Sequence, residues 1–227
     1  MTSVAKPSEV KTAKARVLLV DDHPIVRQGL GQLINEEPDL SIVAEAEDFP
    51  QALTALDEAQ PDVAIVDISL KDRSGVELIK EIRARKPELP ILVLSMHDES
   101  LYGERAIRAG ARGYLNKQEA TKKVIPAIRA ILGGEIFVSE KMTSALLHKL
   151  SGGGKMEGAT PTDVLTDREL EVFQLLGQGL TVREVAERLF VSAKTVEAHR
   201  EHIKQKLNFK TSSELLRFAI QYTLQEK

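Results

Sequence analysis

Val63-Ala64-Ile65-Val66-Asp67 is an unbroken apolar run that ends on a carboxylate. Three of its four apolar residues are β-branched, a pattern typical of a strand buried on both faces inside a parallel sheet. Ligands bind at the carboxyl ends of strands in open α/β sheets, so Asp67 stands where a functional side chain is expected. Taken alone, it has a simpler alternative as a strand-ending Asp that begins a turn.

Short apolar runs and amphipathic stretches alternate around this strand. The predicted strands are 16–20, 41–46, 63–67, 91–95 and 113–115, and the predicted helices are 24–36, 50–59, 75–85, 101–109 and 122–132. Five alternations of strand and helix predict an α/β domain with a doubly wound five-stranded parallel sheet.

Composition limits the class of protein. The 227 residues are 42% apolar and 29% charged and include no Cys, which excludes disulfides and thiolate metal sites. No apolar run approaches the roughly 18 residues of a membrane span, so we expect a cytoplasmic protein without membrane contact. The net charge of -3 argues against a globally basic nucleic-acid binder but leaves local basic patches open.

The domain boundary is predicted in the segment 151–163, which contains four Gly and one Pro. We expect a flexible tail at 1–15, the α/β domain at 16–134, a connecting helix and linker at 135–163, and a second domain at 164–227. The connecting helix is predicted at 140–150, capped by Ser139.

The second domain is predicted to be all-α. Thr166, Thr181 and Thr211 each begin a T-x-x-E capping box, and Ser192 caps a further helix. The four predicted helices are 167–177, 182–189, 193–207 and 212–224. Only Phe190 and Val191 separate the second helix from the cap of the third, which is helix-turn-helix spacing.

Acidic residues follow two strands that we expect to be neighbours. Asp21 and Asp22 come after one strand and Asp67 ends the other, and each pair repels by about 4 kcal/mol at 4 Å. A divalent cation would resolve that conflict, and oxygen ligands without His or Cys favour Mg²⁺ or Mn²⁺. Ser95 and Lys117 end the next two strands, so the set predicts a phosphoryl-transfer site.

Four stretches carry a family resemblance. They are Val20-Asp21-Asp22-His23-Pro24, Asp67-Ile68-Ser69-Leu70, Leu94-Ser95-Met96 and Gly113-Tyr114-Leu115-Asn116-Lys117. They resemble the flavodoxin-like receiver domain of bacterial response regulators, and the whole chain resembles the NarL/FixJ subfamily. The resemblance implies that Asp67 accepts a phosphoryl group from a sensor histidine kinase, and that the chain is not a turnover enzyme.

The same resemblance implies a role for each residue of the pocket. Asp22, Asp67 and the Ser69 backbone carbonyl would ligate Mg²⁺, Asp21 would act through water, Ser95 and Lys117 would bind phosphoryl oxygens, and Tyr114 would change rotamer with Ser95. Phosphorylation would draw Ser95 and Tyr114 inward and favour dimerisation.

The third helix of the second domain has one apolar face. Val196, His199, Ile203 and Leu207 share that face, so His199 is interpreted as a hydrogen-bonded core residue. Residues 192–210 contain five Lys or Arg against two Glu, a concentration of basic charge typical of an element in the DNA major groove. A merely solvated helix is disfavoured because residues four apart on it carry like charges.

Residues 165–224 resemble the LuxR-type DNA-binding domain through the stretch Val191-Ser192-Ala193-Lys194-Thr195-Val196-Glu197-Ala198-His199-Arg200. The resemblance implies base-reading positions at Glu197, Ala198 and Glu201 and backbone contacts from Lys194, Thr195, Arg200 and Lys204. It implies double-stranded DNA as a partner, a homodimer through the last helix, and RNA polymerase as a further candidate partner.

Two other functions compete with this interpretation. A phosphohydrolase of the haloacid dehalogenase type would use Asp67 or Asp21 as nucleophile, but such enzymes carry a D-x-D motif after the first strand, and here the acids are adjacent. The helices after 164 could instead form a protein-binding module, which a gel shift on genomic DNA would distinguish.

Overall fold

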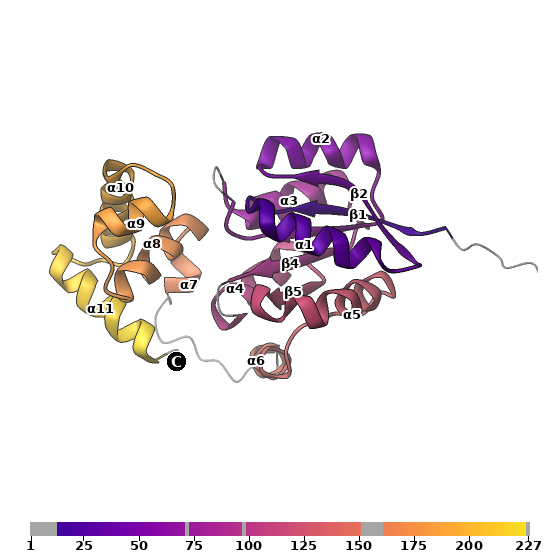
Figure 1. Cartoon of the computed structure of the whole chain (residues 1–227). Coiled ribbons are helices and arrows are strands. Elements are labelled where there is room, and N and C mark those ends of the chain that lie inside the picture. Colours follow the sequence, from indigo (N-terminus) through magenta and orange to yellow (C-terminus); the bar gives the residue numbers. More distant parts are fainter. Residues whose placement is uncertain (1–12, 71–72, 97–98, 151–160, 226–227) are drawn as a thin grey trace, which may run out of the picture.

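The computed structural model describes residues 13–70, 73–96, 99–150 and 161–225. A five-stranded parallel sheet in the order β2-β1-β3-β4-β5 forms the centre of the first domain (Figure 1). The strands are β1 (Ala15–Val20), β2 (Leu40–Ala46), β3 (Val63–Asp67), β4 (Ile91–Ser95) and β5 (Gly113–Asn116). The predicted doubly wound α/β domain is confirmed, although β1 begins inside the predicted N-terminal tail, whose residues 1–12 lie outside the described residues.

Helices cover both faces of the sheet. They are α1 (Pro24–Asn35), α2 (Phe49–Ala59), α3 (Gly75–Arg85), α4 (Glu99–Ala109) and α5 (Ala120–Leu132). Leu19 and Ile65 belong to the apolar cluster shared with α1 and α5, whereas Leu18 and Val66 belong to the cluster shared with α2, α3 and α4. Side chains alternate across each strand, so the predicted strand β3 is buried on both faces.

Local capping explains where two of these helices begin. The Asp48 side chain accepts a hydrogen bond from the Gln51 backbone N–H at the start of α2. Ser74 caps α3, and its hydroxyl accepts a hydrogen bond from the Val76 N–H two residues on.

The segment after α5 returns to the sheet. Phe137 forms a parallel bridge with Gly113, and the Tyr114 N–H donates to the Phe137 carbonyl at 2.8 Å, so this segment covers the outer edge of β5. Helix α6 (Glu140–Leu150) then packs against α4. Most of the predicted linker, residues 151–160, lies outside the described residues, and its last residues begin the short helix α7 (Pro161–Val164).

The C-terminal domain is all-α, as predicted. Its helices are α8 (Asp167–Gly177), α9 (Val182–Arg188), α10 (Ala193–Lys206) and α11 (Ser212–Gln225). Reciprocal capping boxes join Thr166 to Glu169 and Thr181 to Glu184. Gly177 allows α8 and α11 to cross closely, because a Cβ there would lie 2.5 Å from the Ala219 carbonyl oxygen.

Every predicted strand and helix is present, with its ends within two residues of the prediction. The sequence missed α7 and the 3₁₀ turn η1 (Lys117–Glu119), each of which is too short to show a period. Among the described residues, no helix is both long and apolar enough to cross a membrane.

Candidate functional site

Three carboxylates meet at the carboxyl ends of neighbouring strands. Val20 of β1 lies opposite Val66 of β3, so Asp21, Asp22 and Asp67 come to one edge of the sheet. All three are buried, with at most 4% of the residue exposed. Their mutual repulsion in this poorly solvated place must be balanced by a cation or by protonation.

Lys117 supplies one balancing charge from the far side of the pocket. Its Nζ lies 2.7 Å from Asp21 Oδ2 and 2.6 Å from Asp67 Oδ2. Burial alone would lower the pKa of Lys117, but the charges of Asp67 and Asp21 and its hydrogen bonds to them outweigh burial, so the pKa is raised. Lys117 is therefore charged at neutral pH.

The pKa of the Asp67 carboxyl group is raised even though the Lys117 ammonium lies beside it. Burial raises the pKa of Asp67 to about 6, and the charge of Asp21 adds to the effect, while Lys117 and the Ser69 N–H oppose it. The Ser69 backbone N–H donates to Asp67 Oδ1 at 3.2 Å, so one carboxylate oxygen faces the backbone and the other faces Lys117.

The start of α3 presses against the end of β3. The Gly75 N–H donates to the Ile68 carbonyl at 2.7 Å, and a Cβ on Gly75 would lie 2.0 Å from the Asp67 carbonyl oxygen. Only glycine fits this approach, which fixes the backbone that carries Asp67.

Two further predicted residues end the next strands. Ser95 ends β4 beside Asp67, since Leu94 pairs with Asp67, and it is fully buried. Tyr114 lies on β5 and is also buried.

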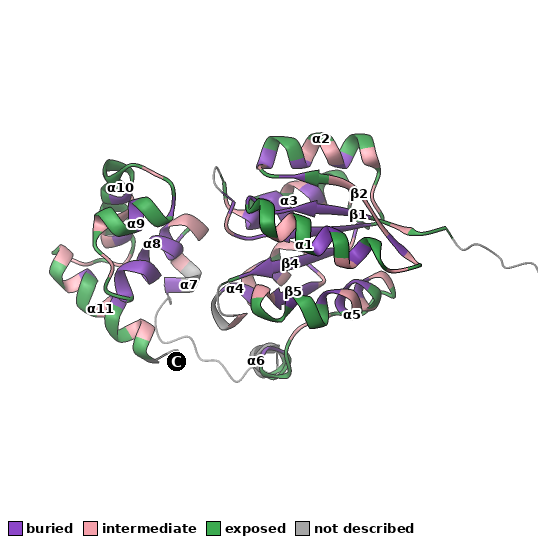
Figure 2. Cartoon of the chain, viewed as in Figure 1, coloured by how far each residue is buried: buried purple, intermediate pink, exposed green. Residues whose placement is uncertain are grey.

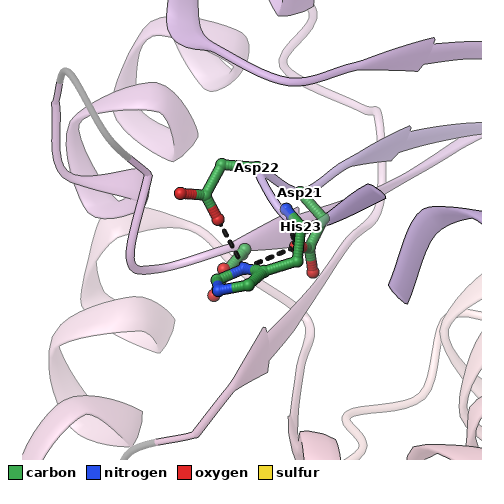
Figure 3. Close-up of side chains that lie close together, drawn as sticks. Asp21, Asp22 and His23 are labelled. Carbon is green, nitrogen blue, oxygen red and sulfur yellow. Dashed lines mark hydrogen bonds and ion pairs between the residues drawn. The ribbon is translucent and has the colours of Figure 1, made fainter. Parts of the chain in front are cut away.

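His23 joins the pocket, which sequence reasoning missed. Its Nδ1 lies 2.6 Å from Asp22 Oδ1 and 3.2 Å from Asp21 Oδ1 (Figure 3). The prediction counted oxygen ligands without histidine, although His23 directly follows the two acids. That adjacency was the available signal, but it does not fix the direction of the ring.

The pocket suits a divalent cation. One ligand atom from each of Asp21, Asp22, His23 and Asp67 lies within 4.8 Å of the others. Carboxylate oxygens are hard donors that suit Mg²⁺ or Mn²⁺, and three buried carboxylates exceed the single charge of Lys117. The residues present therefore fit a metal of this class.

The second candidate site is the helix-turn-helix formed by α9 and α10. Phe190 in the turn has a φ of +53° and is exposed, and the Ser192 hydroxyl accepts from the Thr195 N–H at 3.1 Å to begin α10. Val196 and Ile203 are buried as expected, and His199 is half-buried, with a pKa lowered first by burial and then by the charge of Arg168.

The predicted DNA-facing residues are mostly exposed. Lys194, Thr195, Glu197, Ala198 and Glu201 are exposed, whereas Arg200 and Lys204 are half-buried.

Ion pairs on α10 correct the sequence argument about its charges. Arg200 pairs with Glu197 at 2.6 Å, and Lys204 pairs with Glu201 at 2.7 Å, each three residues apart. The prediction compared only residues four apart, where the charges are alike, and so overlooked these opposite pairs. Any phosphate that approached Arg200 or Lys204 would therefore have to compete with Glu197 and Glu201 for these two cations.

The last helix presents an apolar stripe. Leu216, Ile220 and Leu224 of α11 are exposed and follow one another every four residues. This spacing places them on one face of the helix, while the opposite face packs on α8.

The two domains contact each other through α4 and α8. Arg105 donates to Asp167 Oδ1 at 2.7 Å and to the Leu165 carbonyl. Around this pair, Ile68 and Leu70 of the loop after β3 line a small pocket together with Arg168 of α8. Most of the predicted DNA-facing residues of α10 remain exposed in this arrangement (Figure 2).

Two family models match the chain. Residues 17–129 match "Response regulator receiver domain", and residues 163–219 match "Bacterial regulatory proteins, luxR family".

Two relatives align with this chain over nearly the whole of both sequences. The chain is 36% identical over 215 residues to the oxygen regulatory protein NreC of Staphylococcus aureus, covering 93% of this chain and 99% of NreC. RcsB from Salmonella enterica serovar Typhimurium, bound to promoter P1flhDC in the presence of phosphomimetic BeF3-, is 29% identical. That structure matches with a TM-score of 0.58 and covers 91% of this chain and 98% of RcsB.

A two-component response regulator of the LuxR family from Aurantimonas is 35% identical with a TM-score of 0.56, covering 61% of this chain and 99% of that one.

Proposed function

This chain belongs to the DNA-binding response regulators of two-component systems, which join a receiver domain to a LuxR-type helix-turn-helix domain, and from that premise we propose that its sensor histidine kinase phosphorylates Asp67. The observation that carries the proposal is the convergence of Asp67 Oδ2, Lys117 Nζ and Asp21 Oδ2 within 2.7 Å contacts at the carboxyl end of β3.

The proposed step is one phosphoryl transfer. A carboxylate oxygen of Asp67 forms a bond to phosphorus while the N–P bond of the kinase phosphohistidine breaks, and the imidazole nitrogen leaves with the electron pair. The attacking carboxyl must be ionised, which its pKa of about 6 permits at neutral pH. The transfer is stoichiometric, so the chain is a substrate of its kinase rather than a turnover enzyme.

Neighbouring groups supply a positive charge and a hydrogen-bond donor where the phosphoryl oxygens arrive. Lys117 Nζ already contacts Asp67, and the buried Ser95 hydroxyl ends the adjacent strand. Asp22, Asp67 and the Ser69 carbonyl would hold Mg²⁺ or Mn²⁺, and Asp21 would act through water. When bound, this cation would neutralise charge on the phosphoryl oxygens.

Mass spectrometry tests the phosphoacceptor directly. The protein is incubated with acetyl phosphate and Mg²⁺ and then reduced with borohydride, which converts an aspartyl phosphate to homoserine. We expect the modified residue to be Asp67, with no labelling in Asp67→Asn. Asp57→Asn, on the exposed face of α2, is the matched control and should label like the wild type. Labelling that persists in Asp67→Asn would refute the assignment.

The proposed output is DNA binding by α10. Glu197, Ala198 and Glu201 are the candidate base-reading residues, because an exposed glutamate can accept from cytosine N4. Lys194, Thr195, Arg200 and Lys204 are the candidate phosphate contacts.

Dimerisation completes the proposed switch. Phosphorylation would draw Ser95 and Tyr114 inward and reshape the surface of α4 and α5, which favours pairing of two chains. The exposed stripe on α11 gives the DNA-binding domains a surface to pair through. RNA polymerase is a further proposed partner, and the cytoplasm is the proposed compartment, because the DNA and a kinase's phosphohistidine are both found there.

A further inference from the structure

His23 lies among the proposed metal ligands without a role in the proposed function. Its Nδ1 is 2.6 Å from Asp22 Oδ1 and 3.2 Å from Asp21 Oδ1, and the ring reaches back over the acidic pair (Figure 3). The acids are buried, but the imidazole is about half exposed. A surface histidine that only pointed to solvent would show neither contact.

The backbone aims this ring at the pocket. His23 precedes Pro24, which restricts it to an extended conformation, and its φ and ψ are -94° and 109°. Its own N–H donates to Asp21 Oδ1 at 2.9 Å, and Arg27 Nη1 donates to the Asp21 carbonyl at 2.6 Å. The loop between β1 and α1 therefore holds the backbone of His23 beside the acidic pair, and the contacts of Nδ1 with Asp21 and Asp22 orient the ring.

Helix capping does not account for the side chain. His23 occupies the position before the first residue of α1, yet its side chain makes no capping hydrogen bond to that helix. The imidazole instead faces Asp21 and Asp22. A ring held at this position can reach a cation that is bound to the two carboxylates.

The distances bring the imidazole within reach of direct ligation. An octahedral ion with ligands at about 2.1 Å separates adjacent ligands by about 3 Å. His23 Nδ1 lies 2.6 Å from Asp22 Oδ1 and 3.2 Å from Asp21 Oδ1, so a cation held by Asp22 would replace the direct contact between that carboxylate and the imidazole and bind both. The tautomer with its proton on Nε2 frees the Nδ1 lone pair.

We propose that His23 Nδ1 is a direct ligand of the divalent cation in this pocket and shifts its preference from Mg²⁺ toward Mn²⁺. Mg²⁺ favours oxygen ligands, whereas imidazole nitrogen suits first-row transition metals. The inference rests on the proposed function, because Asp22 and Asp67 are the metal ligands proposed there. It adds a nitrogen donor that an all-oxygen site lacks.

Pulsed electron paramagnetic resonance of the Mn²⁺-loaded full-length protein tests the ligand. An imidazole nitrogen bound to Mn²⁺ gives ¹⁴N modulation of the spin echo. We expect this modulation in the wild type, its loss in His23→Gln, and its retention in His202→Gln, the matched control on exposed α10. Labelling the histidines of the wild type with ¹⁵N should remove the ¹⁴N modulation that comes from imidazole. This readout needs no variant at position 23.

Calorimetric titration with each metal alone tests the preference. We expect His23→Gln to weaken Mn²⁺ binding by about tenfold and Mg²⁺ binding by a clearly smaller factor. Equal loss for both metals, or ¹⁴N modulation that is absent in the wild type or unchanged in His23→Gln, would overturn the role of His23 while leaving the carboxylate site standing. Absence of Mn²⁺ and Mg²⁺ binding in the wild type would instead refute the proposed metal site and this inference with it.

Discussion

Asp67 holds its carboxyl group where a charge is poorly solvated. The residue is 1% exposed, its pKa is raised to about 6 by burial, and Lys117 offsets only part of that cost. This unfavourable placement leaves the carboxylate in need of a cation or a phosphoryl partner. The same residue that we propose as phosphoacceptor therefore destabilises the metal-free fold at neutral pH.

Substituting Asp67→Asn should stabilise the metal-free protein in a pH-dependent way. The folded pKa of about 6 lies above the ordinary 3.8, so the folded state holds more protons between these values and loses stability as pH rises through them. Below about pH 4 the variant and the wild type should differ little. Above about pH 6 the variant should gain up to about 3 kcal/mol, since one pKa unit corresponds to about 1.4 kcal/mol.

Urea unfolding in EDTA across this pH range measures the difference. A gap between the two proteins that stays constant from pH 4 to pH 7 would contradict the assigned pKa and its cause.

Sequence reasoning located the carboxylates but not the imidazole. A buried strand that ends on Asp67 and a neighbouring strand followed by Asp21 determine which edge those acids share. The direction of the His23 ring depends instead on two backbone torsions and on hydrogen bonds to Asp21, which no periodicity encodes.

At the scale of single elements, the N-terminus of α3 determines where the end of β3 lies. A Cβ on Gly75 would lie 2.0 Å from the Asp67 carbonyl oxygen, and a backbone atom cannot move aside as a flexible side chain can. A larger residue at position 75 would therefore displace the start of the helix and the end of the strand together.

Gly75→Ala should lower the free energy of unfolding by at least about 2 kcal/mol and slow labelling of Asp67 by acetyl phosphate. Gly29→Ala in α1 is the matched control, because a Cβ there meets nothing within 4 Å. It should be neutral or stabilise the protein by up to about 1 kcal/mol. Thermal unfolding together with labelling rates measures both effects. Wild-type stability and labelling in Gly75→Ala would contradict the close approach.

Substitutions on helix α10 should distinguish residues that contact DNA phosphates from residues that read bases. Lys194→Ala should weaken binding to all DNA sequences alike and reduce the salt dependence, whereas Glu197→Ala should change the preferred sequence. Glu197→Ala also releases Arg200 from its ion pair, so overall affinity for non-specific DNA should rise. Binding to a randomised DNA pool at two salt concentrations measures both. An unchanged preference in Glu197→Ala would remove it from the base-reading set.

At the scale of the whole molecule, the receiver and the DNA-binding domain contact each other beside the loop that follows Asp67. Arg105 of α4 binds Asp167 and the Leu165 carbonyl, and Leu70 of the loop after β3 lines the same contact. A shift of Arg105 or of Leu70 would therefore alter the contact with the residues at the start of α8. The exposed face of α10 is not covered by this contact.

Arg105→Ala should weaken the contact between the domains by about 1–2 kcal/mol, because a partly buried, charge-assisted pair is lost. Small-angle X-ray scattering should show a larger radius of gyration. Arg108→Ala is the matched control, since Arg108 is mostly exposed and pairs with Glu104 on its own helix. An unchanged scattering curve for Arg105→Ala would show that this pair does not hold the domains together.

The order of the elements follows from the sequence, but the placement of the domains does not. Alternating strands and capped helices specify each domain through local periods and caps. The pair between Arg105 and Asp167 joins residues 62 positions apart across a linker, and nothing in the local pattern marks either residue as a partner.

The most direct test of the account is binding to a pool of genomic DNA fragments, with and without acetyl phosphate and Mg²⁺, for wild type and Asp67→Asn. We predict that the phosphodonor raises enrichment of specific fragments in the wild type only. Equal enrichment of the same fragments by both proteins, whether or not the phosphodonor is present, would contradict control of DNA binding through Asp67.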